Sequence, residues 1–363
     1  AVLAKQATEE AKREVDNKVL ELAKRSIATG DALTAEGETL RALPWYADAA
    51  DLAKGDPELH QAYQRNLMQK IQQAPRLAGM VFLDHNVSSV GFMPDEESFC
   101  LTDWKGPSLS GDISFYETRT GQLLRNESLP GTIRSVEFSR DESFLFTISG
   151  ERTVTVWDAA KGGILRAIDK HDGQVGSHLD ATSDNQLLAV PIRGAKNGIA
   201  LWNLRTGEAA FPMLKTKFGC NMVAFSHDDR FLVASTGGNW FGNGNSGAVS
   251  VWELIPDQGP KLKHRFEINK PVHRVHFSPK DYTFTFACGS IDGQNAPFFA
   301  QTYDAETGRP LSERMEHSGA VFYFELSPDG RWVLTAGIDG TARTWERLTG
   351  TPVSAPMAHE GRL

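Results

Sequence analysis

Residues 315–346 read MEHSGAVFYFELSPDGRWVLTAGIDGTARTWE, and they are the clearest guide to the architecture. An apolar run, Phe324-Glu325-Leu326, precedes a polar turn, Ser327-Pro328-Asp329-Gly330, and a second apolar run leads on toward Trp345-Glu346. Short apolar runs bounded by proline and glycine turns are typical of β-strands. The stretch therefore predicts a small antiparallel sheet.

The same plan occurs six times along the chain. The apolar strands that precede polar turns are Val90-Gly91-Phe92, Val136-Glu137-Phe138, Leu179-Asp180-Ala181, Val223-Ala224-Phe225, Val275-His276-Phe277 and Phe324-Glu325-Leu326. Each repeat then reaches an aromatic residue followed by a polar one: Tyr116-Glu117, Trp157-Asp158, Trp202-Asn203, Trp252-Glu253, Tyr303-Asp304 and Trp345-Glu346. Self-similarity at about 40–45 residues with a terminal Trp-Asp predicts propeller blades.

On these repeats the sequence resembles the WD-repeat family. The resemblance implies a mainly β fold, a WD-repeat β-propeller over residues 76–363, preceded by an α-helical segment. It also implies a structural hydrogen-bonded tetrad, which the last repeat matches with His317, Thr335, Asp339 and Trp345. The second repeat keeps Thr147 and Trp157 but has Glu151 for the aspartate and no histidine.

The repeats leave ring closure open. Met357-Ala358-His359-Glu360-Gly361 repeats the pattern of Met315-Glu316-His317-Ser318-Gly319, where a blade begins. We therefore expect a seven-bladed or longer array that has been cut at its C-terminus. In the alternative, residues 77–83 supply an outer strand that closes a ring of six. An unclosed ring would expose blade faces and favour aggregation.

Residues 1–75 carry helical periodicity instead. Apolar residues recur every three to five positions from Ala7 to Ile27, and Gly30-Asp31 is expected to interrupt this first helix. A second helix is expected over 38–54, with Pro44 starting or kinking a turn of it. Gly55-Asp56-Pro57 predicts a stop, a cap and a first-turn proline for a third helix that ends near Gln73. An apolar seam is expected to include Leu43, Trp45, Tyr46, Ala49, Leu52, Tyr63, Leu67 and Ile71.

The helical segment carries a second resemblance. Residues 42–49, 55–58 and 74–77 look like the linker of large bacterial WD-repeat proteins that have a serine/threonine protein kinase domain upstream, and the linker resembles a tetratricopeptide-type hairpin. The resemblance implies a kinase-associated signalling role in a longer polypeptide. It leaves the compartment open: cytoplasmic, or extracytoplasmic if a membrane helix lies upstream. This chain itself has no kinase signature.

Composition excludes several other classes of function. The net charge of −8 disfavours nucleic acid as a partner. The three cysteines are too widely spaced for a zinc site or a disulfide framework, and no apolar run is long enough for a membrane span. Strand alternation is expected to send His273 and His276 to opposite faces, which excludes a metal pair. No cofactor is expected.

Long insertions before the aromatic strand provide the candidate binding residues. They carry Trp104, Arg193, Lys196, Trp240, Phe241, Phe298 and Phe299. Aromatic side chains on long loops are good anchors for a partner. In the alternative, the rings fold back and cap the blade tops.

These observations predict a non-catalytic protein-interaction scaffold or sensor module. It would bind a protein or peptide on the loop-rich propeller face or at the channel mouth. No residue is predicted to be catalytic, because the histidine and aspartate of the tetrad are structural. The alternatives are a structural spacer between modules, or a small-ligand or enzymatic propeller with acid and base groups in its channel.

Overall fold

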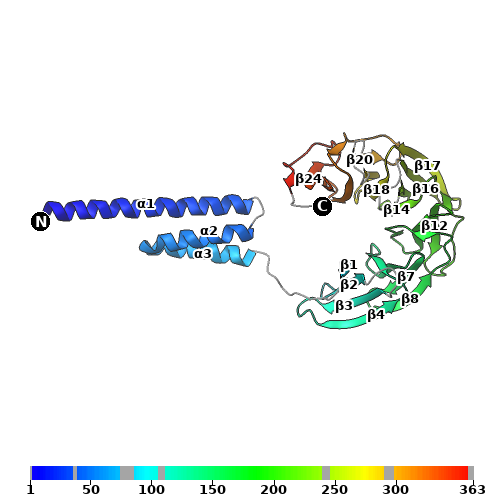
Figure 1. The fold of residues 1–363 in the computed structure, drawn as a ribbon, viewed down its shortest axis with the longest axis horizontal. Coiled ribbons are helices and arrows are strands. Elements are labelled where there is room, and N and C mark those ends of the chain that lie inside the picture. The colour runs from blue at the N-terminus through cyan, green and yellow to red at the C-terminus, as the bar shows by residue number, and fades with distance from the viewer. Residues whose placement is uncertain are drawn as a thin grey trace. The chain divides into compact units, whose positions relative to one another are not determined.

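The computed structural model describes residues 2–35, 39–73, 86–104, 111–238, 246–289 and 298–358. The chain forms two compact units, Ala1–Met80 and Val81–Leu363. The first unit is helical and the second is built of β-sheets (Figure 1). Among the described helices, none is both long enough and apolar enough to cross a membrane.

The first unit contains α1 (Val2–Ala35), α2 (Thr39–Leu52), a 3-10 turn η1 (Ala53–Gly55) and α3 (Pro57–Gln73). The expected interruption at Gly30-Asp31 is wrong, because α1 continues through both residues. One glycine costs a helix only about 1 kcal/mol, which packing can offset. Here the Tyr46 ring lies against Gly30, where an added Cβ would be 3.0 Å from Tyr46 Cζ.

Tyr46 is the centre of the helical packing. Its ring is fully buried, and its hydroxyl donates to Asp31 Oδ1 at 2.7 Å and lies 3.0 Å from Thr34 Oγ1. Ala49 is also fully buried, but Trp45 is 43% exposed and does not belong to the expected seam. The seam is therefore narrower than predicted, with one aromatic side chain at its centre.

The ends of α2 and α3 follow local signals in the sequence. Pro44 lies inside α2 and does not start it. Asp56 precedes α3, and its Oδ1 accepts the backbone N–H of Leu59 at 3.1 Å, while Pro57 is the first helical residue. Asp56 thus caps the helix with a side-chain acceptor, and Pro57 stands where no helical N–H is needed.

The second unit consists, in its described part, of six antiparallel sheets, here called blades 1 to 6 in chain order. The innermost strands are β1 (Asn86–Phe92), β5 (Ile133–Phe138), β9 (Gln174–Val175) with β10 (Asp180–Ala181), β14 (Cys220–Phe225), β18 (Val272–Phe277) and β22 (Val321–Leu326). The second strands are β2 (Ser98–Trp104), β6 (Phe144–Ser149), β11 (Leu187–Arg193), β15 (Phe231–Gly237), β19 (Thr283–Cys288) and β23 (Trp332–Gly337).

The third strands carry the repeated aromatic residue, and the fourth strands lie on the outside of each blade. The third strands are β3 (Gly111–Glu117), β7 (Thr153–Asp158), β12 (Gly198–Asn203), β16 (Gly247–Ile255), β20 (Phe298–Asp304) and β24 (Thr341–Glu346). The outer strands are β4 (Leu123–Leu129), β8 (Ile164–Ile168), β13 (Leu214–Lys215), β17 (Gly259–Ile268), β21 (Met315–His317) and β25 (Met357–Ala358).

The sheets are arranged radially, as in a WD β-propeller. In Figure 1 they lie on an arc with the innermost strands toward the centre, and the arc is open between blade 1 and blade 6. Val90 and Phe92 of blade 1 are 65% and 66% exposed, and Tyr323 and Leu334 of blade 6 are 46% and 44% exposed. The first and last blades thus expose apolar side chains. Residues 77–83 lie outside the described part of the chain, so ring closure by that segment stays a prediction.

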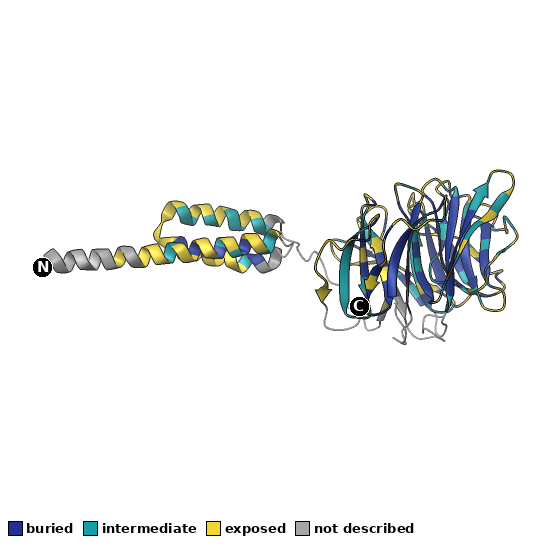
Figure 2. Ribbon diagram, turned by 90° about the horizontal axis from the view of Figure 1, so that it is seen from above, coloured by how far each residue is buried: buried dark blue, intermediate teal, exposed yellow. Residues whose placement is uncertain are grey.

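The core lies between neighbouring blades. One cluster joins Val249 and Val251 of blade 4 to Phe284 and Phe286 of blade 5, and others join the remaining neighbours. Figure 2 shows the buried residues running along the strands of the sheets. Radial stacking therefore covers sheet faces that a single blade could not bury by itself.

Candidate functional site

The predicted tetrad of blade 6 forms a continuous hydrogen-bonded chain. His317 Nδ1 lies 3.1 Å from Asp339 Oδ2, His317 Nε2 lies 2.7 Å from Thr335 Oγ1, and Trp345 Nε1 donates to Thr335 Oγ1 at 2.8 Å. Burial lowers the pKa of His317, while hydrogen bonds to Asp339 hold the pKa of that carboxyl at about 2. The four side chains thus form one hydrogen-bonded network inside the blade.

The other blades keep less of this network. In blade 2, Trp157 Nε1 donates to Thr147 Oγ1 at 3.0 Å. In blade 3, Val190 occupies the same register position as Thr335, two residues beyond the strand partner of the tryptophan. Trp202 Nε1 and both ring nitrogens of His171 consequently lack hydrogen-bond partners among the described residues. Repeats that match the family pattern less well therefore form fewer of the tetrad hydrogen bonds.

Two of the predicted binding residues are not on a loop. Phe298 and Phe299 are the first residues of β20, and they are only 2% and 4% exposed. Phe298 packs with Ala320 and Phe322 of the next blade, and Phe299 belongs to the cluster shared by blades 4 and 5. The prediction of an exposed loop position is wrong, because radial packing extends the strand to cover both rings.

The other predicted binding residues are placed unevenly. Trp240 and Phe241 lie outside the described residues, and Trp104 ends β2. Arg193 ends β11, and its guanidinium donates to the Gly238 carbonyl at 2.7 Å. Lys196 is exposed and pairs with Asp172 at 2.5 Å. Their role in binding stays a prediction.

His273 and His276 do not point to opposite faces as expected. The ring of His273 lies 4.6 Å from that of Phe322, and the ring of His276 lies 5.2 Å from that of Phe324, so both contact β22. A register shift between Val272 and Arg274 causes this, since a bulge breaks strand alternation. Even so, the described residues contain no cluster of three histidine, cysteine, aspartate or glutamate side chains that could hold a metal ion.

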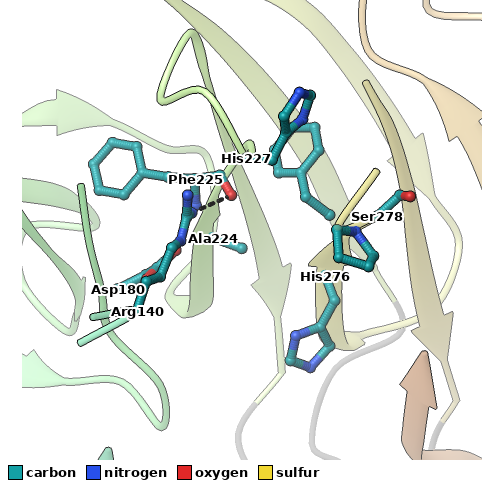
Figure 3. A pocket seen from close by; sticks show the side chains of 9 residues that line it. Arg140, Asp180, Ala224, Phe225, His227, His276 and Ser278 are labelled. Carbon is teal, nitrogen blue, oxygen red and sulfur yellow. Dashed lines mark hydrogen bonds and ion pairs between the residues drawn. The ribbon is translucent and has the colours of Figure 1, made fainter. Parts of the chain in front are cut away.

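A cavity of about 320 Å³ opens where the innermost strands end. Its lining combines apolar, imidazole and charged groups: Arg140, Asp180, Ala224, Phe225, His227, His276, Phe277, Ser278 and Pro279. Figure 3 shows Arg140, Asp180 and Phe225 on one side, with His276 and Ser278 on the other. Because neighbouring strands of a blade are antiparallel, this mouth lies at the opposite end of the strands from the predicted insertions.

Arg140 fixes one wall of the cavity. Its guanidinium donates to the carbonyl oxygens of Phe225 and Ser226 at 2.6 and 2.7 Å, and it pairs with Asp180 at 3.2 Å and Asp229 at 3.3 Å. These contacts connect blade 2 to blades 3 and 4. Burial raises the pKa of Asp180, and Arg140 opposes that shift. The wall is therefore held by hydrogen bonds before any ligand binds.

Further titratable side chains gather along the centre of the propeller. Burial raises the pKa of Glu137 to about 8, and its Oε2 accepts the backbone N–H of Leu179 at 3.1 Å. Burial and the charge of Arg274 lower the pKa of His178 to about 4 and that of His276 to about 3. The charge of Arg274 thus affects His178 of blade 3 and His276 of blade 5. The three side chains therefore lie near one another at the channel.

Sequence reasoning missed this channel cluster, although the repeats contain the pattern that marks it. Glu137, Asp180, His276 and Glu325 are the middle residues of four of the six apolar triplets that precede the turns. In a strand with apolar neighbours, a titratable residue at the same place in successive repeats indicates a shared environment. The repeats could therefore have predicted a polar channel, but not its contacts.

Comparison with known proteins agrees with the fold. The family model of the WD domain, G-beta repeat, matches residues 122–158 and 308–346. The chain is 22% identical over 237 residues to the serine-threonine kinase receptor-associated protein of Dictyostelium discoideum, covering 65% of this chain and 73% of that protein. It is 26% identical over 222 residues to eukaryotic translation initiation factor 3 subunit I of Aspergillus terreus. The latter match covers 58% of this chain and 61% of the relative, so the chain spans about three fifths of that relative.

A solved structure resembles the chain over a larger share of its length. A chain of the Kuenenia stuttgartiensis hydrazine synthase aligns with a TM-score of 0.59 at 14% identity, covering 79% of this chain and 90% of that chain. At this identity the likeness concerns the fold alone.

Proposed function

We propose that this chain, a WD-repeat β-propeller with an N-terminal helical segment, is a non-catalytic scaffold that binds a peptide segment of a partner protein. WD-repeat relatives are generally scaffolds that bind proteins, and two of them are a translation factor subunit and a receptor-associated protein. The cavity at the channel mouth is the observation that carries the proposal. The upstream kinase domain and a signalling role stay predictions, and the relatives named above are eukaryotic.

The cavity has the properties of a peptide site. About 320 Å³ is at the lower end of the range of ligand pockets and is enough for one or two side chains. Its walls offer apolar contact from Ala224 and Phe277 and hydrogen bonding from His227 and Ser278. Arg140 is already held by two carbonyl groups, so little side-chain entropy is lost when a ligand binds beside it.

The loop-rich face remains a second candidate surface of the same function. Lys196 is exposed there, and Trp240 and Phe241 stand in the sequence between β15 and β16. Phe298 and Phe299 no longer support this surface, because both are buried. The two mouths of the channel can therefore be tested against each other.

Capture from a lysate of the source organism tests the proposal with two matched variants. The first, His227→Ala with Pro279→Ala, removes exposed side chains from the cavity. The second, Trp240→Ala with Phe241→Ala, changes the segment of sequence between β15 and β16. We expect a protein retained by the wild-type chain to be lost with the first variant at an unchanged melting temperature.

The other outcomes are equally informative. Loss with the second variant alone would move the site to the loop-rich face. Equal retention by all three chains would contradict both surfaces. Retention of nothing by the wild-type chain would favour a structural spacer.

A further inference from the structure

The channel contains a guanidinium group without an adequate counter-charge. Arg274 on β18 has a side chain only 12% exposed, and the carboxylate with which it pairs, Glu325, lies 3.7 Å away with a side chain that is 72% exposed. Its guanidinium carbon lies 4.3 Å from the centre of the Tyr323 ring. At 3.7 Å the pair is too long for a charge-assisted hydrogen bond, so the charge of Arg274 is only weakly compensated.

Three polar atoms around this group lack partners. Arg274 Nε, His178 Nδ1 and His276 Nε2 are buried, and none makes a hydrogen bond of standard geometry with any described residue. Leaving a buried polar atom unpaired costs about 1–3 kcal/mol. The three atoms come from blades 3 and 5, and the charge of Arg274 lowers the pKa of both histidines, so the three groups lie near one another.

The other acidic groups of the channel are already occupied. Glu137 accepts hydrogen bonds from Ser135 Oγ at 2.7 Å and from the Leu179 backbone at 3.1 Å, and Asp180 pairs with Arg140. Burial raises the pKa of Glu137 to about 8 and the charge of Arg274 opposes that shift, but no ion pair joins these two described side chains. The compensating charge must come from outside these residues.

We propose that the central channel binds a carboxylate group on the Arg274 guanidinium, with the rings of His178 and His276 as additional donors. A guanidinium presents paired N–H groups that match the two oxygens of a carboxylate, and a neutral imidazole can donate one N–H. A doubly charged phosphate fits less well, because one guanidinium carries a single positive charge. His276 also lines the cavity at the channel mouth, so the proposed site adjoins that cavity.

The carboxylate has two possible sources. It is either a free small acid or an acidic side chain of a bound peptide, and only the second source rests on the proposed function. Titration calorimetry with two probes separates them: sodium glutarate, and the peptide acetyl-Gly-Gly-Glu-Gly-Gly-amide beside its glutamine counterpart. The chains are the wild type, Arg274→Gln, His178→Gln and the control Arg331→Gln, which changes an exposed arginine that lies over Trp332.

We expect the wild type to bind at least one acidic probe, and the glutamine peptide at least tenfold more weakly. Arg274→Gln should reduce affinity for the acidic probe at least tenfold, His178→Gln should reduce it by a smaller factor, and Arg331→Gln should leave it unchanged. Binding of glutarate alone would identify a free acid, and binding of the peptide alone an acidic side chain. If Arg274→Gln does not fold, the His178→Gln titration decides.

Other results would overturn the proposal. They are no binding of either acidic probe, equal affinity for the glutamate and glutamine peptides, or an equal loss with Arg274→Gln and Arg331→Gln. Glutarate binding without lysate capture would separate failure of the proposed function from failure of the carboxylate site. The two experiments therefore give independent answers.

Discussion

Trp202 lies edge-on to His171 with ring centroids 5.1 Å apart, and no described residue accepts its indole N–H. In blade 6 the corresponding N–H donates to Thr335, and the ring of His317 contacts the same hydroxyl. Blade 3 has Val190 where blade 6 has Thr335, and residues 191–197 contain no aspartate that could correspond to Asp339. Blade 3 thus keeps two members of the network without the group that joins them.

Val190→Thr should therefore stabilise the propeller. The new hydroxyl would accept from Trp202 and meet His171, which should add about 1 kcal/mol for two otherwise unpaired buried groups. Val156→Thr is the matched control, because Val156 is buried in the same cluster and its hydroxyl would join no such network. Thermal unfolding should show a higher midpoint for the first variant and a lower one for the second. A lower midpoint for both would mean that His171 cannot reach the new group.

Acid should destabilise the protein through its buried histidines. Burial lowers the pKa of His171 to about 4, whereas an unfolded histidine titrates near 6.5. Between these values the unfolded chain binds the extra proton, so stability is complete above pH 6.5 and falls toward pH 4. His171→Phe should flatten the dependence of the melting temperature on pH in this window. Burial also lowers the pKa values of His178, His273 and His276. Part of the pH dependence should therefore remain in His171→Phe.

Glu137 should have the opposite effect at higher pH. Its folded pKa is raised to about 8 by burial, and the unfolded value is about 4.5, so the folded chain holds the extra proton between them. The contribution of Glu137 to stability is therefore greatest below pH 4.5 and is lost as the pH rises toward 8. Between pH 7 and 8 the buried histidines are mostly neutral in both states, so Glu137 contributes most of the pH dependence. Glu137→Gln should remove the decline in melting temperature across this interval, and an unchanged decline would contradict the assignment.

Gly30→Ala should destabilise the helical unit, against ordinary helix propensity. Alanine in a helix interior is favoured over glycine by about 1 kcal/mol. At position 30, however, the new methyl would be 3.0 Å from Tyr46 Cζ, and hydrogen bonds to Asp31 and Thr34 hold that ring in place. Hydrogen exchange of the α1 amides should become faster in Gly30→Ala. In a Tyr46→Ala background the same change should slow exchange, which makes the pair a double-mutant cycle.

The sequence predicts what is local in this fold and misses what depends on radial packing. Turn residues and aromatic spacing locate the blades, and the last repeat supplies all four members of the tetrad. The buried positions of Phe298 and Phe299 follow from the neighbouring blades, which no single repeat reveals. The same holds for Arg274. Its charge lowers the pKa of histidines from two blades because the sheets surround a common axis, and no single repeat shows this.

The expectation that His273 and His276 diverge failed for a related reason. Their spacing is correct for opposite faces of a regular strand, but the register shift in β18 turns both toward β22. Bulges depend on pairing with a neighbouring strand, so an alternation rule applied to one strand cannot locate them. The continuation of α1 through Gly30 is a second example in the helical unit. It depends on packing against the Tyr46 ring of α2, which the pattern of α1 alone does not reveal.

Phe92→Ser should reduce self-association without lowering stability. Phe92 is 66% exposed on the innermost strand of blade 1, where Val90 is 65% exposed, and its ring lies edge-on to that of Phe99 with the centroids 6.3 Å apart. An uncovered strand with apolar side chains favours association between molecules. Light scattering at rising concentration should show less association for Phe92→Ser at an unchanged melting temperature. Phe146→Ser is the control, because Phe146 is 1% exposed and its loss should lower the melting temperature. A lower melting temperature for Phe92→Ser as well would instead mean that this face is covered in solution, as a propeller with a further blade requires.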